Sequence, residues 1–125
     1  MANFFIAGLP EDGVPPWDFR ASQVEEGEEV PRDTSAGAIA ASGLLELAGL
    51  LDEPIGRPYR AAAERILGSL AAKYATWDDP QHEAILLQGT GHKPANQNVN
   101  VSLIYGDYFF VEAFAKLRGW SRRIF

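Results

Sequence analysis

The chain has 125 residues, and its 46% hydrophobic and 11% aromatic content is enough for the core of one domain, so a second full domain is not expected. Its 11 basic and 17 acidic residues give a net charge of −6, and residues 1–33 carry this whole excess because the remainder holds nine residues of each sign. The sequence therefore lacks the basic surface of a protein that binds nucleic acid or an anionic membrane, and without cysteine it forms neither disulfides nor thiolate metal sites.

The sequence shows no targeting or membrane-spanning pattern. Its apolar runs are all shorter than the roughly 18 residues that cross a membrane. The first five residues, MANFF, lack the basic start and the small-residue cleavage site of a signal peptide. We therefore expect a cytoplasmic protein with no membrane partner.

The first quarter of the chain is predicted to be mainly a long loop. After a short helix at 3–7, residues 10–33 contain four prolines, which restrict the backbone and remove hydrogen-bond donors. The acidic run at 25–29 is expected to be a solvated linker. Residues 17–19 place two large aromatic side chains around a carboxylate, so we expect this part of the loop to be buried against the core or against a ligand.

Two helices are predicted to follow. The first runs from Asp33, whose carboxylate can cap the first turn, to about Leu51. Between residues 36 and 51 only Glu46 is charged, so this helix is apolar almost all round and requires neighbours on more than one side. The second helix, at about 57–75, has Pro58 in its first turn and a single apolar stripe, which predicts an outer helix with one buried face.

The remaining residues alternate between loops and one more helix. Residues 83–87 are short enough to be an extended segment or a helical turn, and residues 89–98, rich in glycine, proline and asparagine, are predicted to be a loop. A last helix at 103–117 is apolar on most of its circumference and ends before Gly119. The expected order of the three main helices is inner, outer, inner, which is typical of a layered helical barrel or array that three helices are too few to close.

The polar residues of the loops indicate no metal or catalytic motif. His82 and His92 are the only histidines, and their spacing is not that of a zinc site. Asp33 and Asp107 stand at predicted helix starts, where a carboxylate caps the helix or compensates its dipole. For Asp18 two interpretations stay open: a partly desolvated carboxyl with a strongly perturbed pKa, or an acceptor of backbone N–H groups that hold the loop.

The glycine-rich loop at 89–98 has the groups needed to bind a polar ligand. It offers backbone N–H groups, asparagine amides, the imidazole of His92 and the ammonium group of Lys93, a set that can bind hydroxyls and an anion. It lacks the Gly-Lys-Ser/Thr ending of a phosphate-binding loop. A hydrogen-bonded turn without a ligand is the alternative interpretation.

Several sequence blocks, read together, resemble a known enzyme family. They occur in a common order over nearly the whole chain: 9–15 (LPEDGVP), 17–19 (WDF), 32–36 (RDTSA), 39–47 (IAASGLLEL), 62–67 (AAERIL), 91–94 (GHKP) and 102–109 (SLIYGDYF). These blocks are similar to the closing portion of glycoside hydrolase family 88, the unsaturated glucuronyl hydrolases. Pro16 and Gln88 depart from the family pattern, which has an aromatic residue at the first position and commonly a histidine at the second.

The resemblance implies an all-α fold, the terminal part of an (α/α)6 barrel, with residues 1–125 as a single segment of this six-hairpin domain. The family removes a 4,5-unsaturated uronic acid from the products of polysaccharide lyases. An aspartic acid protonates the double bond, water adds at C5, and the resulting hemiketal opens. No cofactor is implied, and the family's catalytic aspartates match no position here, so the resemblance implies no catalytic residue in this chain.

The resemblance does imply residues that bind the substrate, an unsaturated uronic-acid oligosaccharide. Trp17 and Asp18 would line the aromatic loop, and His92 and Lys93 would lie near the uronate or a neighbouring anionic sugar substituent. Arg32 is a weaker candidate, since it can also neutralise part of the acidic loop.

Two other functions stay open beside a segment of a glucuronyl hydrolase. One is a noncatalytic helical module that binds carbohydrate or protein, and the other is part of a related hydrolase of unsaturated rhamnogalacturonan fragments. In each case the nearly all-apolar helices predict an exposed patch of roughly several hundred Å² on the isolated chain. We therefore expect self-association or a partner that covers this patch.

Overall fold

The computed structural model describes residues 1–21 and 29–120. These contain α1 (Ala2–Gly8), α2 (Thr34–Leu50), α3 (Glu53–Ser69), the π-helical turn η1 (Leu70–Tyr74), the 3-10 helix η2 (Lys93–Ala95) and α4 (Ile104–Leu117). Between helices the described residues form isolated β-bridges and no strand, so the predicted all-α class is confirmed. Of the acidic run at 25–29, only Glu29 lies within the described residues.

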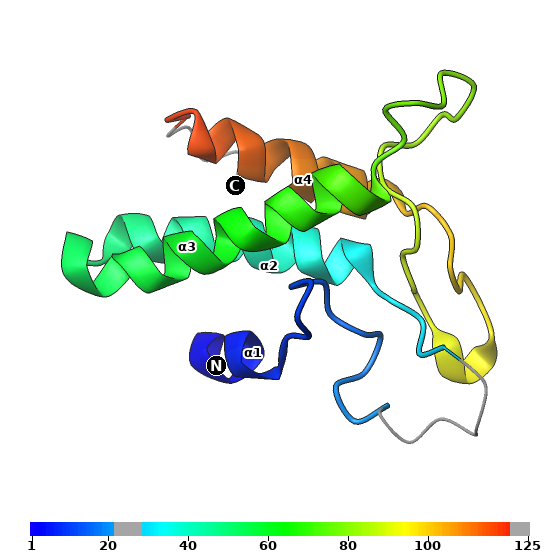
Figure 1. Cartoon of the computed structure of the whole chain (residues 1–125), viewed down its shortest axis with the longest axis horizontal. Helices are drawn as coiled ribbons and strands as arrows, with labels where there is room; N and C mark the ends of the chain where they lie inside the picture. The colour runs from blue at the N-terminus through cyan, green and yellow to red at the C-terminus, as the bar shows by residue number, and fades with distance from the viewer. Residues whose placement is uncertain (22–28, 121–125) are drawn as a thin grey trace.

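Helix α2 is the centre of the molecule (Figure 1). It packs against both α3 and α4, whereas α3 and α4 scarcely touch each other. The expectation that this apolar helix is covered on more than one side is therefore confirmed. The core that surrounds it draws on the helices and on two loops, and its buried hydrophobic residues are Val14, Ala38, Ala41, Leu44, Leu45, Ala62, Ala63, Ile66, Leu67, Leu70, Tyr74, Leu86, Phe110 and Ala113.

The start of α2 is fixed by its cap and by a close contact with α4. Asp33 Oδ1 accepts hydrogen bonds from the N–H groups of Ser35 and Ala36 at 3.1 and 3.3 Å, as its predicted capping role requires. In α4, a Cβ at Gly106 would lie only 3.0 Å from the Ser35 Cβ. Because glycine has no side chain, the N-terminal ends of α2 and α4 approach closely.

The start of α3 differs from the prediction. This helix begins at Glu53 rather than near Arg57, and Pro58 lies inside the helix instead of opening it. Pro54 explains the earlier start, because proline has a helical φ and its missing N–H is not needed in a first turn. Sequence reasoning assigned that position to the wrong proline.

The predicted one-sided character of α3 is confirmed. Its buried residues are Gly56, Ala62, Ala63, Ile66 and Leu67. Its outer surface carries two exposed ion pairs at helical spacing, Arg57 with Glu53 at 2.8 Å and Arg60 with Glu64 at 2.9 Å. The helical backbone continues through η1 to Tyr74, close to the predicted end.

Helix α4 buries one face against α2 and exposes another apolar one. Phe110 and Ala113 are buried in the core, whereas Ile104 is 82% exposed and Val111 is 54% exposed. We use the name α4 face for Ile104, Tyr108 and Val111, which are spaced along one side of the helix and are all exposed. No helix of residues 1–21 and 29–120 has the length and hydropathy to cross a membrane.

The loops gather at one end of the helical layers, where α2 and α4 begin and α3 ends (Figure 1). Asp107, in the first turn of α4, accepts hydrogen bonds from the N–H groups of Ile85 and Leu86, both at 2.9 Å. Leu86 also pairs with Ala75 in a single β-bridge. The segment at 83–87 is therefore extended, and Asp107 anchors it in addition to lying at a helix start.

Candidate functional site

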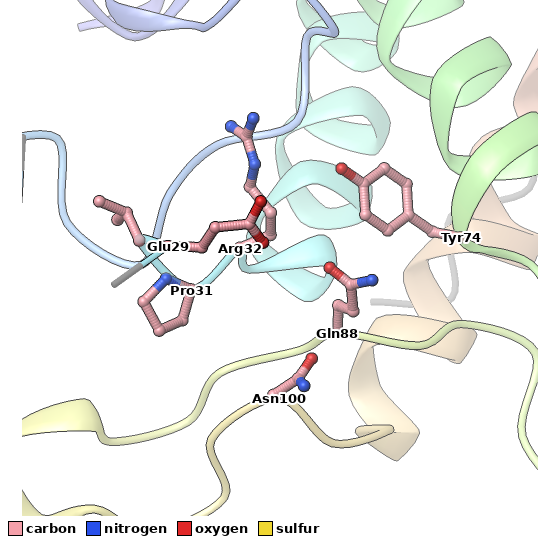
Figure 2. Close-up of a pocket in the computed structure, with 7 residues that line it drawn as sticks. Glu29, Pro31, Arg32, Tyr74, Gln88 and Asn100 are labelled. Atoms are coloured by element: carbon pink, nitrogen blue, oxygen red, sulfur yellow. The ribbon is translucent and has the colours of Figure 1, made fainter. Parts of the chain in front are cut away.

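A polar cleft of about 540 Å³ opens at the loop end of the molecule (Figure 2). Its lining comes from four separate parts of the chain: Glu29, Val30, Pro31, Arg32, Tyr74, Gln88 and Asn100. The polar side chains among these supply a carboxylate, a guanidinium, a phenol and two amides. Such a set of donors and acceptors in a concave surface suits a ligand rich in hydroxyl groups.

One wall of the cleft is held by hydrogen bonds between Asp12, Arg32 and Tyr74. Tyr74 Oη donates to Asp12 Oδ2 at 2.9 Å, and Arg32 Nη2 lies 3.5 Å from the same oxygen. Arg32 Nη1 also donates to the Val14 carbonyl at 2.9 Å. The guanidinium is therefore fixed in place, and the Asp12 carboxylate offsets part of its charge.

The phenol of Tyr74 acts as a hydrogen-bond donor. Burial raises the pKa of Tyr74 above its usual 10.0, and the hydrogen bond to Asp12 and the negative charge of that carboxylate raise the pKa further. The hydroxyl is thus protonated at neutral pH. Because the folded-state pKa is raised, its contribution to stability is complete below the pKa of tyrosine in the unfolded chain and is lost as pH rises through the folded-state pKa.

The opposite wall is tied to the start of α2. Thr34 Oγ1 donates to the Leu87 carbonyl at 2.6 Å, across 53 residues of sequence. Thr90 Oγ1 donates to the Arg32 carbonyl at 2.8 Å, and the Thr90 N–H donates to Asp33 Oδ1 at 3.3 Å. These bonds hold the proline-rich loop at 10–33 against the glycine-rich loop at 89–98. The site residues were predicted in these two loops.

Trp17 and Asp18 lie beside the cleft rather than in its lining. Trp17 is half-buried, and its backbone N–H donates to the Pro31 carbonyl at 3.0 Å. Asp18 lines a neighbouring hollow of about 220 Å³, which shares Val30 and Arg32 with the cleft. The aromatic loop therefore adjoins the cleft through these two shared residues.

The surroundings of Asp18 decide between its two interpretations. Its Oδ1 accepts a hydrogen bond from the Arg20 N–H at 2.8 Å. This backbone hydrogen bond, aided by the Arg20 charge and only partly opposed by burial, lowers the pKa of Asp18 below its usual 3.8. The interpretation as an acceptor that holds the loop is confirmed, and the carboxyl is only partly withdrawn from water, since its side chain is 31% exposed.

His92 and Lys93 lie at the far side of the glycine-rich loop. His92 is exposed, and its backbone pairs with that of Gln97 through bonds of 3.0 and 3.1 Å. Lys93 begins η2 and is half-exposed. Neither residue lines the cleft or the hollow beside Asp18, so a ligand in the cleft would reach them only by extending outward along the loop.

Tyr74 and Asn100 line the cleft although sequence reasoning did not mark them as site residues. Tyr74 follows Leu70 by one helical turn and is an aromatic residue with a polar tip at the end of a helix, which is the available signal. Asn100 has a φ of 56°, a left-handed conformation that asparagine tolerates better than most residues. The asparagine-rich composition of its loop is the corresponding signal in the sequence.

The polar groups that line the cleft are suited to binding a ligand rather than to acid and base catalysis. Of the residues that the structure describes, Glu29 is the one carboxyl that lines the cleft, whereas acid and base catalysis on a sugar uses two differently tuned carboxyl groups. In the part of the chain that the structure describes, no group of three or more histidine or acidic side chains is arranged to hold a metal ion.

Comparison with known proteins gives close relatives for nearly the whole chain. No protein-family model matches it. The unsaturated glucuronyl hydrolase of Bacillus sp. (strain GL1) is 39% identical over 119 residues, which are 94% of this chain and 31% of the relative. The unsaturated chondroitin disaccharide hydrolase of Streptococcus agalactiae serotype III (strain NEM316) is 34% identical over 124 residues, 97% of this chain and 30% of the relative. The chain thus spans about a third of the length of these curated relatives.

Solved structures agree with the sequence comparison. The crystal structure of the Bacillus sp. GL1 enzyme, described as responsible for the degradation of glycosaminoglycan, matches with a TM-score of 0.86 over 94% of this chain and 31% of that one. A mutant of the Streptococcus agalactiae unsaturated glucuronyl hydrolase, complexed with dGlcA-GalNAc6S, matches with a TM-score of 0.80 at 32% identity, over 96% of this chain and 32% of that one. These enzymes have an (α/α)6 barrel, so the predicted fold class and the family resemblance are confirmed. By sequence and by fold, the chain is a relative of the unsaturated glucuronyl hydrolases and corresponds to about a third of one.

Proposed function

We propose that the chain is a substrate-binding third of an unsaturated glucuronyl hydrolase, an enzyme that removes 4,5-unsaturated uronic acid from polysaccharide-lyase products by hydrating a vinyl ether. The observation that carries the proposal is the match of 94% of the chain to the Bacillus enzyme, at 39% identity and a TM-score of 0.86. The polar cleft supports it, because its phenol, amide and guanidinium groups are suited to sugar hydroxyls.

The proposal assigns catalysis to parts of the enzyme that this chain does not supply. Hydration of the vinyl ether needs an acid that protonates the double bond while water adds at C5. The described part of the chain contributes one carboxyl to the cleft lining, that of Glu29, which is an exposed residue. We therefore expect the isolated chain to be inactive and its contribution to be the positioning of substrate.

Four residues are proposed to contact the oligosaccharide around the cleft. Asp18 would do so from the hollow beside Arg32, which shares Val30 and Arg32 with the cleft, and Trp17 would do so from the adjacent position in the same loop. His92 and Lys93 would meet an anionic substituent outside the cleft, where both carry their polar groups at the surface of the loop. Their distance from the lining fits an extended ligand rather than a single sugar.

The domain boundaries follow from the same proposal. Residues 1–125 would form a single segment of a six-hairpin barrel, in which further helices cover the α4 face. On the isolated chain this exposed face favours self-association or a partner. A cytoplasmic location is part of the proposal, and cell fractionation tests it.

A chimeric enzyme tests the proposed activity. In the Bacillus enzyme, the third that matches this chain is replaced by residues 1–125, and hydration of an unsaturated disaccharide is followed by loss of the ultraviolet absorbance of its double bond. We expect activity from the chimera and none from the isolated chain or from the Bacillus enzyme that lacks this third. A chimera that folds, as judged by circular dichroism, but hydrates no unsaturated disaccharide would contradict the proposal.

The same chimera tests the site residues. We expect Lys93→Ala to raise KM for a sulfated disaccharide about three- to tenfold without a comparable change in kcat, because a charge-assisted hydrogen bond would be lost in binding alone. Lys73→Ala is the matched control, since Lys73 is exposed at the end of the outer helical segment. Equal effects of both variants would show that Lys93 acts only through general charge.

A further inference from the structure

Two residues that line the cleft have the same unusual backbone conformation. Gln88 has a φ of 59° and Asn100 a φ of 56°, both in the left-handed region that residues with side chains seldom adopt. Each directly precedes one partner of a β-bridge: Gly89 and Val101 exchange N–H to carbonyl hydrogen bonds of 2.7 and 2.9 Å. The two amide residues are thus placed at equivalent positions on paired segments, and both conformations cost conformational free energy.

The surrounding contacts impose this conformation on Gln88. The preceding residue, Leu87, donates its N–H to the Tyr74 carbonyl at 2.9 Å and accepts from Thr34 Oγ1 at 2.6 Å. The Gln88 carbonyl accepts from the Thr34 N–H at 3.2 Å. At the next position a side chain would be crowded, because a Cβ on Gly89 would lie 2.9 Å from Leu103 Cδ1 and 3.0 Å from the Val101 carbonyl oxygen. Strain that is fixed from both sides in this way is found at ligand-binding positions.

The two amides stand between two hollows. Gln88 and Asn100 line the cleft of about 540 Å³ and also an adjoining hollow of about 300 Å³. The adjoining hollow contains Ser102, whose buried hydroxyl makes no hydrogen bond to the described residues. Figure 2 shows the Gln88 and Asn100 side chains on the same side of the cleft, across from the segment that carries Glu29 and Arg32.

The charges around the cleft favour an uncharged ligand group. Among the described residues, Arg32 is the one cation in the lining, and it already lies 3.5 Å from the Asp12 carboxylate while Glu29 adds a further negative charge. From these described residues, a carboxylate or sulfate in the cleft would therefore meet no net positive charge. The Gln88 and Asn100 amides, in contrast, each offer a donor and an acceptor without charge, which matches a pair of neighbouring hydroxyls.

We infer that Gln88 and Asn100 form a paired-amide clamp that recognises an uncharged, hydroxyl-bearing sugar ring linked to the unsaturated uronate. The inference rests on the proposed function and adds a substrate preference to it. The two amides would bind hydroxyls of the sugar ring that carries the uronate, and a charged group in place of such a hydroxyl would weaken binding.

Glycine substitutions test the clamp without destabilising the chain. At a left-handed position glycine relieves strain, so Gln88→Gly and Asn100→Gly remove an amide while they preserve or raise the melting temperature. Asn98→Gly is the matched control, because Asn98 has a φ of 51° in the same loop but lines neither hollow. The probes are an unsaturated glucuronyl-N-acetylgalactosamine disaccharide, its sulfated counterpart and free N-acetylgalactosamine.

Binding of these probes to the full 125-residue chain is measured by nuclear magnetic resonance, with the side-chain NH₂ signals of Gln88 and Asn100 as local reporters. We expect both signals to shift with the unsulfated disaccharide, each clamp variant to bind about three- to tenfold more weakly, and the control to bind normally. Unchanged affinity in both clamp variants, or tighter binding of the sulfated form at these signals, would overturn the clamp but leave the proposed function to stand on the activity of the chimera. Shifts with free N-acetylgalactosamine in a chain whose chimera is inactive would support the clamp and count against the proposed function.

Discussion

Helices α3 and α4 pack against the same neighbour, α2, yet their outer surfaces are opposite in character. The outer surface of α3 carries the exposed ion pairs of Arg57 with Glu53 and of Arg60 with Glu64. The α4 face, formed by Ile104, Tyr108 and Val111, is apolar and exposed. The charged groups on the outer surface of α3 are well solvated by water, whereas the α4 face has the composition of a buried surface.

This difference indicates that the apolar pattern of a helix is not explained by its contacts with α2 alone. Both helices bury a stripe against α2, so the contacts to α2 do not explain why only α3 has a polar outer surface. The structures that match the chain are about three times its length. In the proposed whole enzyme α3 faces water and α4 faces further helices, and each sequence fits that environment.

Substitution in the core should separate the two helices most strongly. Ile66 of α3 is fully buried, so Ile66→Ala removes three carbon atoms from the core and leaves a cavity. We expect the free energy of unfolding to fall by about 2–5 kcal/mol, measured by urea denaturation. Ile104→Ala deletes the same atoms from the α4 face, where we expect a change within about 0.5 kcal/mol. Equal losses would show that Ile104 is covered within the chain.

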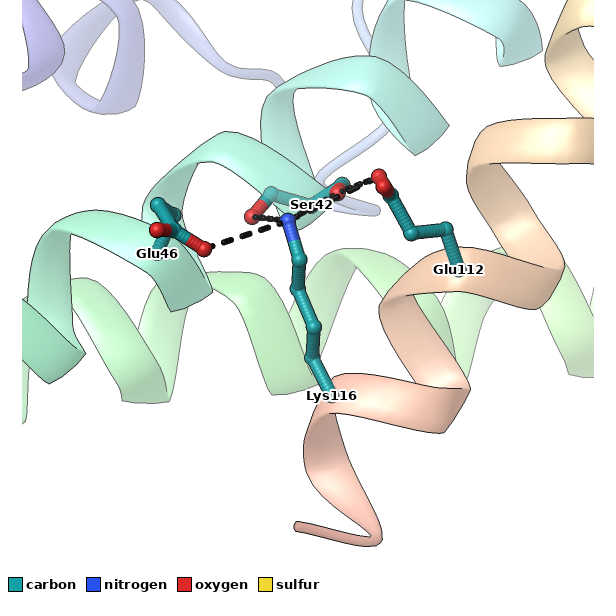
Figure 3. A network of polar contacts seen from close by, with 4 residues as sticks. All are labelled: Ser42, Glu46, Glu112 and Lys116. Carbon is teal, nitrogen blue, oxygen red and sulfur yellow. Dashed lines mark hydrogen bonds and ion pairs between the residues drawn. The ribbon is translucent and has the colours of Figure 1, made fainter. Parts of the chain in front are cut away.

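The contact between α2 and α4 contains a polar network that can be broken next (Figure 3). Lys116 Nζ donates to Ser42 Oγ at 2.9 Å, and this hydroxyl donates to the Glu112 carboxylate. The same Nζ lies 3.5 Å from Glu112 and 3.6 Å from Glu46. The network therefore joins two helices through one ammonium group and two carboxylates.

Removal of the ammonium group should destabilise the chain by about 1–3 kcal/mol, because Lys116→Met leaves the largely buried Glu112 carboxylate without its cation. Urea denaturation of the single variant and of the double variant Lys116→Met, Glu112→Leu measures this effect. We expect the double variant to recover part of the loss, since it leaves no unpaired charge. If the double variant loses more free energy of unfolding than Lys116→Met alone, the loss comes from packing rather than from the unpaired charge.

The helices of this fold were the part that sequence patterns could predict. The long apolar run and the Asp33 cap predicted α2 closely, and the apolar residues before Gly119 predicted α4. Periodicity also predicted the buried and solvated sides of α3. It failed at the start of that helix because Pro54 and Pro58 are both compatible with a first turn, and only the structure shows which one fills it.

The cleft was beyond the reach of the same patterns. Its walls depend on hydrogen bonds between residues far apart in sequence, such as Tyr74 to Asp12 across 62 residues. Nothing in local spacing marks Tyr74 for that partner. Asp18 was the reverse case: its hydrogen bond to the Arg20 N–H is local, so one of the two interpretations drawn from the sequence was the right one.

A charge on the α4 face should change association more than stability. We expect Val111→Lys to reduce concentration-dependent self-association of the isolated chain by roughly tenfold or more, because burying an unpaired ammonium group between copies is unfavourable. Sedimentation velocity measures the association, and binding of a hydrophobic dye should fall with it. Ala61→Lys is the matched control, since Ala61 is exposed on α3. If neither variant changes the association, the α4 face is not the surface that drives it.

The smallest expected effect compares ion pairs of the same spacing on the two helices. Arg60 with Glu64 on α3 and Lys116 with Glu112 on α4 are both four residues apart, but the α3 side chains are 53% and 50% exposed whereas those of α4 are 22% and 12% exposed. We expect Glu64→Gln to lower the free energy of unfolding by less than about 0.5 kcal/mol and the change to disappear in high salt. Glu112→Gln should cost more, and salt should screen it less, because its surroundings exclude water. A loss of about 1 kcal/mol or more at Glu64 would mean that the outer surface of α3 is not open to solvent, and the assignment of α3 as the water-facing helix would then be wrong.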